Sequence, residues 1–202
     1  VNVKKTVPIT SKVLSVNERM DAFGKPICKI DLPIVNPPNN KNQAAAIAFI
    51  NSHCNPEHEQ ELRSHLFKSG WRHVSSSSDL APVIKILPRT ETAVVDAYLT
   101  PIMTEYLNGV SRHIKKGKLY VMTSAGGLVS RDNYRAKDSL LSGPAGGVVG
   151  AAFFGEQAGI NNIIGFDMGG TSTDVCRFDS KYDYKFEHKI GNTRVVTPCA
   201  KY

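Results

Sequence analysis

The sequence has 202 residues, of which 41% are hydrophobic and 21% charged, and this composition is typical of a globular protein of one large or two small domains. It excludes a membrane protein, because no apolar run approaches the roughly 18–20 residues of a spanning helix. Residues 1–16 hold no continuous apolar segment of a signal peptide. We therefore predict a cytoplasmic protein without membrane contact.

The net charge of +7 is compatible with a phosphate or nucleic-acid partner. The Lys and Arg residues are dispersed, however, and the densest group, Arg112–Lys118, lies where a helix is expected to end. We predict no nucleic-acid site. The four cysteines, Cys28, Cys54, Cys176 and Cys199, are far apart, which favours reduced thiols. A zinc site that uses Cys54 with His53 or His58 is the alternative, although the spacing fits no metal motif.

In the first half of the chain, residues 21–26 (DAFGKP) predict a hairpin turn, and residues 35–43 (VNPPNNKNQ) predict a loop. Residues 44–53 are expected to form a buried strand. A helix should follow, with Asn55 as N-cap, Pro56 at the first helical position and Gly70 after its end. A strand over residues 71–78 would complete a strand–helix–strand unit.

In the second half, helical spacing of apolar residues predicts a helix from about Thr90 to Lys116, with a kink or restart at Pro101. Residues 118–124 should form a strand. Ser142 is expected to cap a helix whose inner face is Val148, Val149, Ala152 and Phe153. Strands are then predicted over residues 161–167, 173–178, 182–190 and 193–198. Alternating strands and helices indicate an α/β layered fold.

The segment Asp167–Asp174 (DMGGTSTD) carries two acids and three hydroxyls around paired glycines, which a structural hairpin does not need. Backbone N–H groups in such a turn bind anions, and a carboxylate at a strand end holds Mg²⁺ through water. Asp167 is the predicted metal residue and Asp174 would position a metal-bound or attacking water. The predicted phosphate-binding residues are Gly169, Gly170, Thr171, Ser172 and Thr173.

A second anion site is predicted at Ser142–Gly147 (SGPAGG), where N–H groups would point out of a helix N-terminus. Its candidate residues are Gly143, Gly146 and Gly147. The alternative is that these glycines only pack the helix tightly on a sheet. Ser124 lacks the GxSxG pattern of a hydrolase nucleophile, and Arg89 is a candidate for binding a phosphate or an inter-domain carboxylate.

Together these segments resemble the hydantoinase/oxoprolinase family of ATP-dependent enzymes. The resemblance rests on LSGPAGGVVGA followed by IGFDMGGTSTDV, with NPEHEQEL, PRTETAVVDAYLTP and MTSAGGL in family order, and it extends from about Val13 to Pro198. It implies an incomplete α/β fold of ribonuclease-H-like, actin-like ATPase lobes, with a mixed sheet and flanking helices. Residues 1–88 would be the C-terminal part of the family's N-terminal domain. Residues 89–202 would be the N-terminal part of the hydantoinase A/oxoprolinase domain.

The segments at residues 73–101 and 174–187 resemble the 5-oxoprolinase branch most closely. This resemblance implies ATP-driven hydrolysis of 5-oxo-L-proline to L-glutamate through phosphorylation of the amide oxygen, with ATP and Mg²⁺ as cofactors. Asp167 would then assist the metal, Gly169 to Thr173 would cradle phosphate and Asp174 would be polar support. An N-methylhydantoinase or related carboxylase beta-type subunit is the second expectation, and a non-catalytic truncated remnant is the third.

The chain also departs from the family pattern. It holds no GGTFTD-like first phosphate loop and no adenosine-binding segment. We therefore expect a central fragment, inactive alone, that works with the remainder of a longer polypeptide, a partner subunit or a second copy. Its ligands would be a nucleotide and a small cyclic amide. The residues that would bind the lactam and the oligomeric state are not assigned by the sequence.

Overall fold

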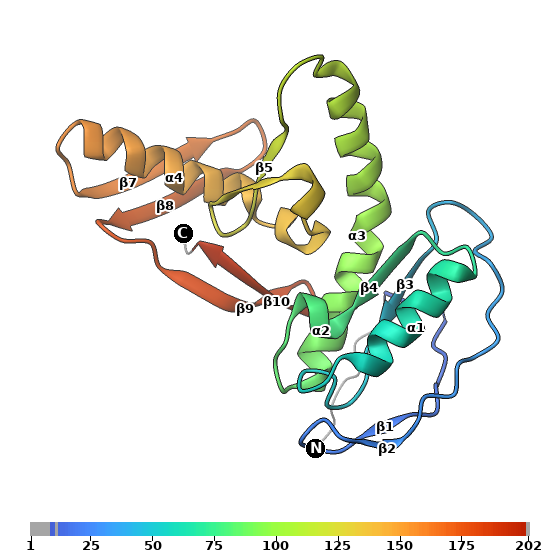
Figure 1. Cartoon of the computed structure of the whole chain (residues 1–202). Coiled ribbons are helices and arrows are strands. Elements are labelled where there is room, and N and C mark those ends of the chain that lie inside the picture. The colour runs from blue at the N-terminus through green and yellow to red at the C-terminus, as the bar shows by residue number, and fades with distance from the viewer. Residues whose placement is uncertain (1–8, 11, 201–202) are drawn as a thin grey trace. The chain divides into compact units, whose positions relative to one another are not determined.

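A computed structural model describes residues 9–10 and 12–200, and the chain divides into two compact units (Figure 1). Unit 1 comprises Val1–Tyr106 and Lys189–Val196, and unit 2 comprises Leu107–His188 and Thr197–Tyr202. The prediction that residues 1–16 contain no signal peptide falls largely on residues 1–8 and 11, outside the described residues. Within the described ranges, no helix is long and apolar enough to cross a membrane.

Unit 1 begins with the predicted hairpin. β1 (Arg19–Met20) pairs antiparallel with β2 (Pro26–Cys28), and the turn between them is closed by Asp21. The Asp21 carboxylate accepts the backbone N–H groups of Phe23 and Lys25, each at 2.8 Å. The predicted loop at residues 35–43 contains neither helix nor strand.

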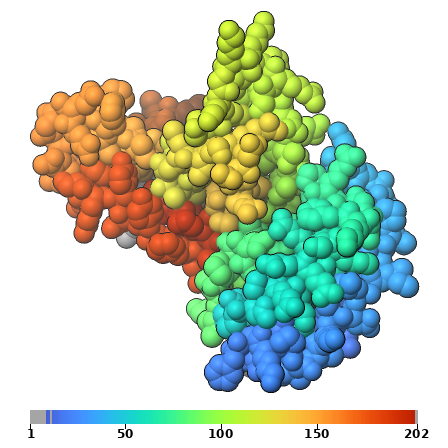
Figure 2. Space-filling model, in the orientation of Figure 1, coloured from blue at the N-terminus to red at the C-terminus, as the bar shows by residue number. Residues whose placement is uncertain are grey.

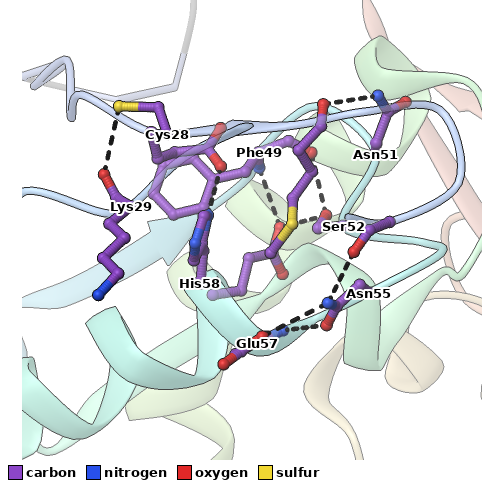
Figure 3. A network of polar contacts seen from close by, with 12 residues as sticks. Cys28, Lys29, Phe49, Asn51, Ser52, Asn55, Glu57 and His58 are labelled. Atoms are coloured by element: carbon purple, nitrogen blue, oxygen red, sulfur yellow. Dashed lines mark hydrogen bonds and ion pairs between the residues drawn. The ribbon is translucent and has the colours of Figure 1, made fainter. Parts of the chain in front are cut away.

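The predicted strand–helix–strand unit is confirmed by β3 (Ala44–Ile47), α1 (Glu57–Lys68) and β4 (His73–Ser76). β3 and β4 are parallel, with Ala44 opposite His73. The Asn55 side chain accepts the Glu57 N–H at 3.0 Å, beside the start of α1 (Figure 3). The buried side of α1 supplies Leu62 and Leu66 to the core, whereas its outer face (cyan) lies at the surface in Figure 2.

α2 (Ser77–Leu80) follows β4, and the long helix α3 (Ile86–His113) begins four residues before its predicted start. The threonines expected near the helix start instead donate to carbonyls of the preceding turn: Thr90 to Ile86 at 2.8 Å and Thr92 to Pro88 at 2.7 Å. Of the two predicted alternatives at Pro101, a kink or a restart, the structure excludes the restart. α3 is continuous there, because one missing N–H removes one of the many backbone bonds of a 28-residue helix.

Unit 2 starts with the last turns of α3, which β5 (Tyr120–Met122) and β6 (Leu128–Ser130), an antiparallel pair, follow. Two short 3₁₀ turns come next, η1 (Arg131–Asn133) and η2 (Ala136–Ser139). α4 (Ser142–Gln157) follows and packs along the antiparallel hairpin of β7 (Asn162–Met168) and β8 (Thr173–Asp179), as Figure 1 shows. β9 (Tyr184–Ile190) pairs with β10 (Thr193–Ala200).

The inner face of α4 is formed by Ala145, Val148 and Ala152, all buried. The prediction was right for Val148 and Ala152. Val149 is only half-buried, and Phe153 is 54% exposed, so the prediction was wrong for Phe153. Every sheet among the described residues is two-stranded, with one parallel pair in unit 1. Helices and strands of both pairings confirm the mixed α/β class.

Candidate functional site

The predicted phosphate loop is the turn between β7 and β8. The Gly169 N–H closes this turn by donating a hydrogen bond to the Ser172 carbonyl at 2.9 Å. Asp167 and Asp174 face each other directly across the two strands. The Gly169 N–H is thus used by the turn itself, and within the described chain no acceptor is found for the N–H groups of Gly170, Thr171 and Ser172. These three N–H groups remain open to a ligand.

The side chains around this turn are all exposed, and among the described residues they form no hydrogen bond or ion pair; they are Asp167, Thr171, Ser172, Thr173 and Asp174. Two carboxylates directly opposite each other repel, so their pairing costs stability in the absence of a cation. A hairpin selected for stability alone would not place them there. The arrangement is open, rich in oxygen atoms and suited to a cation and an anion held together.

The start of α4 is the second predicted anion site. The prediction that Ser142 caps this helix is wrong: Ser142 is its first residue, and its hydroxyl donates to the Ser139 carbonyl at 3.0 Å. The first N–H groups of a helix lack partners within it, and Pro144 has no N–H. The N–H groups of Ser142 and Gly143 are therefore the first candidates for an anion.

Packing explains only some of the glycines of α4 and β7. A Cβ at Gly155 would overlap the Ile163 side chain, and one at Gly165 would lie 2.5 Å from Cys176 Sγ, so glycine at both positions permits close packing. At Gly143 and Gly147, by contrast, a Cβ would meet no atom of the described chain within 4 Å, and at Gly146 it would make one ordinary contact of 3.9 Å. Tight packing of the helix therefore does not account for Gly143 and Gly147.

The two predicted anion sites lie at the same end of this helix–hairpin layer. α4 and β7 run in opposite directions, so that Gly155 contacts Ile163 and Ala151 lies beside Gly165 (Figure 1). Four residues of helix and two residues of strand each advance about 6 Å. At this spacing, the next positions toward that end of the layer are Gly147 on α4 and Asp167 on β7.

The carboxylates at this turn fit the coordination that Mg²⁺ prefers, in which few protein side chains bind the ion. Mg²⁺ takes oxygen ligands, keeps several waters and commonly binds through one or two carboxylates together with phosphate oxygens. Asp167 and Asp174 supply two carboxylates at one strand end. Across the described ranges no group of three or more His, Cys, Asp or Glu side chains forms a protein-only metal site, so a metal here would depend on a bound phosphate for its remaining ligands.

The alternative zinc site is not assembled among the described residues. Cys54 Sγ lies 3.2 Å from His53 Nε2, but His58 Nδ1 lies 2.8 Å from the Glu18 carboxylate instead. All four cysteines are free thiols, as predicted.

Arg89, a candidate for phosphate or an inter-domain carboxylate, is fully buried within unit 1. Its guanidinium lies 3.6 Å from the Glu59 carboxylate and donates to Ser52, to Ser77 and to the Phe49 carbonyl. Burial lowers the pKa of Arg89, and Glu59 opposes this shift. Arg89 is therefore placed as a structural cation in the interior of unit 1.

Sequence reasoning did not identify the role of Ser124. The residue is fully buried, and its hydroxyl donates to the Asp138 carbonyl at 2.7 Å while accepting the Leu141 N–H at 3.0 Å. It is not placed as a nucleophile. The signal in the sequence was its position two residues before the pair Gly126–Gly127. Gly126 has φ of +79°, and a Cβ there would lie 2.9 Å from Val149 Cγ2 on α4.

Comparison with known proteins identifies the family of this chain. The sequence model of the hydantoinase/oxoprolinase family matches residues 89–201, more than half of the chain, and the chain belongs to this family. It is 42% identical over 159 residues to 5-oxoprolinase 1 of Arabidopsis thaliana and 42% identical over 162 residues to 5-oxoprolinase of Saccharomyces cerevisiae. These matches cover 76% and 77% of this chain but only 12% of each relative. The chain thus spans about an eighth of their length.

Solved structures of the same kind match nearly the whole chain. The nucleotide-free structure of acetone carboxylase, an enzyme of ATP-dependent acetone carboxylation, has a TM-score of 0.73 and 25% identity, covering 92% of this chain and 28% of that one. ATP-dependent caprolactamase from Pseudomonas jessenii has a TM-score of 0.74 and 24% identity, covering 99% of this chain and 32% of that one, which shows the fold alone. The mixed α/β fold of this chain is thereby that of ATP-dependent enzymes of the family.

Proposed function

We propose that this chain is part of an ATP-dependent 5-oxoprolinase, which hydrolyses 5-oxo-L-proline to L-glutamate with coupled hydrolysis of ATP. The observation that carries the proposal is the 42% identity to two proteins named 5-oxoprolinase over about three quarters of this chain. Opening an unstrained lactam is unfavourable by itself, and coupling to ATP provides the driving force. The exposed acids, hydroxyls and N–H groups at the β7–β8 turn support a role in holding phosphate.

In this proposal each group at the turn has a role that its position supports. The free N–H groups of Gly170, Thr171 and Ser172 bind phosphate oxygens, and the turn-closing N–H of Gly169 keeps that loop in shape. The hydroxyls of Thr171, Ser172 and Thr173 add donors. Asp167 holds Mg²⁺ through water, and Asp174, opposite it, orients a water or supports the metal. Mg²⁺, when bound, neutralises phosphate charge.

The N-terminal half of α4 forms the second part of the site in this proposal. Its first N–H groups, at Ser142 and Gly143, bind anionic oxygens, and the missing side chains of Gly143, Gly146 and Gly147 leave room for the ligand or for backbone to approach. The antiparallel contacts of Gly155 with Ile163 and of Gly165 with Ala151 support this assignment, because they put the start of α4 and the end of β7 toward the same end of the helix–hairpin layer.

We further propose that polypeptide outside this chain completes the site, as a continuation of the same protein, a partner subunit or a second copy. The basis is that the chain spans about 12% of the two 5-oxoprolinases it matches. Residues 1–88 and 89–202 would then belong to two neighbouring domains with ribonuclease-H-like lobes, and the protein would act in the cytoplasm on a nucleotide and a small cyclic amide.

A second function is favoured by a separate observation. Acetone carboxylase shares the fold at a TM-score of 0.73 with 25% identity. A carboxylase beta-type subunit or an N-methylhydantoinase would use the same phosphate turn on a different carbonyl substrate. The two functions differ in which compound stimulates ATP hydrolysis: 5-oxo-L-proline for the first, a ketone with bicarbonate or N-methylhydantoin for the second.

The test is ADP release measured with the protein that contains this chain, in the presence of ATP·Mg²⁺ and each candidate substrate. We expect stimulation by 5-oxo-L-proline with equimolar appearance of L-glutamate, and loss of that stimulation in Asp167→Asn. Unchanged ATPase activity in Asp167→Asn would remove the metal assignment. Stimulation only by a ketone with bicarbonate would replace the proposed substrate.

The isolated 202-residue chain provides a second measurement. We expect weak ATP·Mg²⁺ binding, seen as changes in the amide resonances of Gly169 and Gly170, and no turnover. No binding at all would favour a non-catalytic remnant. Release of ADP that depends on 5-oxo-L-proline would contradict the proposal that other polypeptide completes the site.

A further inference from the structure

Ser124 connects three separate segments of unit 2. Its backbone N–H and its hydroxyl both donate to the Asp138 carbonyl, at 2.8 Å and 2.7 Å. The hydroxyl oxygen accepts the Leu141 N–H at 3.0 Å, and the Ser124 carbonyl accepts the Ala200 N–H at 2.8 Å. The residue is fully buried, so these bonds lie out of contact with water, where an unpaired partner is costly. One side chain therefore bridges both ends of the turn at residues 138–141.

The Asp138 carboxylate extends this network to β10. Thr197 donates its hydroxyl to Asp138 Oδ1 at 2.5 Å, and Lys137 Nζ lies 2.7 Å from the same oxygen and 3.0 Å from the Thr197 hydroxyl. Thr197 and Lys137 are both buried. Burial also raises the pKa of the neighbouring Cys199 thiol, which keeps it neutral beside this charge pair. Charge-assisted bonds away from water are stronger and more directional than surface contacts.

The segment fixed by this network leads directly into α4. Leu141 is the residue before the helix, and its N–H is the group that the Ser124 hydroxyl binds. The same β5–β6 loop also contacts α4 from the side, where Gly126 approaches Val149. The direction of the first free N–H groups of α4, at Ser142 and Gly143, thus depends on where Ser124 and Asp138 hold the turn before them.

We propose that Ser124 is a positioning residue for phosphate binding at the N-terminus of α4, with Asp138 and Thr197 anchoring the turn that it bridges. The inference rests on the proposed function, because it requires that the α4 N–H groups bind a phosphate of ATP. Ser124 itself does not touch that phosphate. Its hydroxyl proton is directed to a backbone carbonyl, and the residue orients the helix start through Leu141.

The experiment compares Ser124→Ala with Ser139→Ala in the 202-residue chain. Ser139 lies in the same turn, but its hydroxyl bonds the Ala136 carbonyl at 2.8 Å and not the Leu141 N–H that leads into α4. Amide exchange of Leu141, whose N–H the Ser124 hydroxyl binds, and the dissociation constant of ATP·Mg²⁺ are measured by NMR in each protein. In Ser124→Ala we expect about five- to tenfold faster exchange and a comparable loss of affinity, as the loss of one buried hydrogen bond implies; in Ser139→Ala we expect neither.

A second pair keeps the test valid if Ser124→Ala lowers overall stability. Thr197→Val removes the anchoring hydroxyl with little change of shape and should weaken ATP·Mg²⁺ binding about threefold, whereas Thr197→Ser retains the hydroxyl and should restore wild-type affinity. Faster exchange with unchanged affinity in Ser124→Ala would overturn the inference, as would equal loss of affinity in Ser139→Ala. If ATP·Mg²⁺ shifts no α4 amide in the wild-type chain, the proposed phosphate role of α4 fails first, and this inference fails with it.

Discussion

Each unit of the chain has a cluster of carboxylate and hydroxyl groups, and the two clusters have opposite surroundings. In unit 1 the Glu59 carboxylate is fully buried and accepts bonds from backbone and serine groups of two segments, residues 49–52 and 77–78. In unit 2 Asp167 and Asp174 face each other at an exposed strand end, where the described residues provide neither with a partner.

This difference in surroundings separates a carboxylate that stabilises the fold from carboxylates that are available to a ligand. The bonds to Glu59 span 2.6–3.0 Å, and their donors are Phe49 N, Ser52 Oγ, Ser77 Oγ, Ser78 N and Ser78 Oγ. Figure 3 shows Phe49 and Ser52, from the connection between β3 and α1, side by side in this network. A carboxylate that its own chain satisfies completely has no capacity left for a ligand. The acids of unit 2 retain theirs.

The largest expected effect tests the buried cluster. Glu59→Ala leaves the buried Arg89 guanidinium without its carboxylate, and we expect a loss of about 3–5 kcal/mol in the free energy of unfolding. Asp167→Ala is the matched control and should change it by no more than about 0.5 kcal/mol. Urea titration followed by circular dichroism measures both. Equal destabilisation by the two variants would show that exposure does not separate the clusters.

The glycines of α4 offer a second way to sharpen the comparison. Gly155→Ala places a methyl against Ile163 and should destabilise by about 1–3 kcal/mol, as overpacking does. Gly147→Ala, in the same helix but facing open space, should stabilise by up to about 1 kcal/mol through helix propensity.

Thermal unfolding and ATP·Mg²⁺ titration together give the result for both alanine variants. If Gly147 faces the ligand, its alanine variant gains stability but binds ATP·Mg²⁺ more weakly. A Gly147→Ala chain that loses stability would instead mean that packing had fixed this glycine.

The fold was predictable where local chemistry decides it. Gly70 correctly marked the end of α1, and Asn55 marked its start to within one residue, since Pro56 is the N-cap and Glu57 the first helical residue. The paired glycines of the turn marked the β7–β8 hairpin. The start of α3 was missed because the Thr90 and Thr92 hydroxyls donate to carbonyls of the preceding helical turn. The sequence does not distinguish a threonine that bonds back in this way from a threonine that caps a helix.

The site was predictable in its residues but not in its support. The acids and hydroxyls after β7 form an unusual local pattern, so sequence alone identified them. The roles of Ser124, Glu59 and Arg89 depend on partners 12 to 40 residues away, which no local pattern contains. The four serines at 75–78 were predicted only as part of a strand, yet Ser77 and Ser78 bind Glu59 and Ser75 binds Asp96 at 2.7 Å.

The smallest expected effect concerns the repulsion between Asp167 and Asp174. Like charges directly opposite each other on paired strands destabilise the pairing by roughly 0.2–1 kcal/mol. Neutralising one acid, in Asp167→Asn or Asp174→Asn, should therefore raise the melting temperature slightly at low salt. The gain should shrink at high salt, because both groups are exposed to the screening ions.

Mg²⁺ distinguishes this repulsion from an ordinary surface effect. With ATP·Mg²⁺ present, the wild-type acids are attracted to the cation, so the stability order should reverse, with the wild type melting above both asparagine variants. The control is Asp179→Asn on the same strand, since Asp179 already pairs with Arg177 at 2.5 Å and should show no dependence on ATP·Mg²⁺. An asparagine variant that stays more stable than the wild type at saturating ATP·Mg²⁺ would mean that the two acids do not form the cation site. The cost of placing them together would then need another explanation.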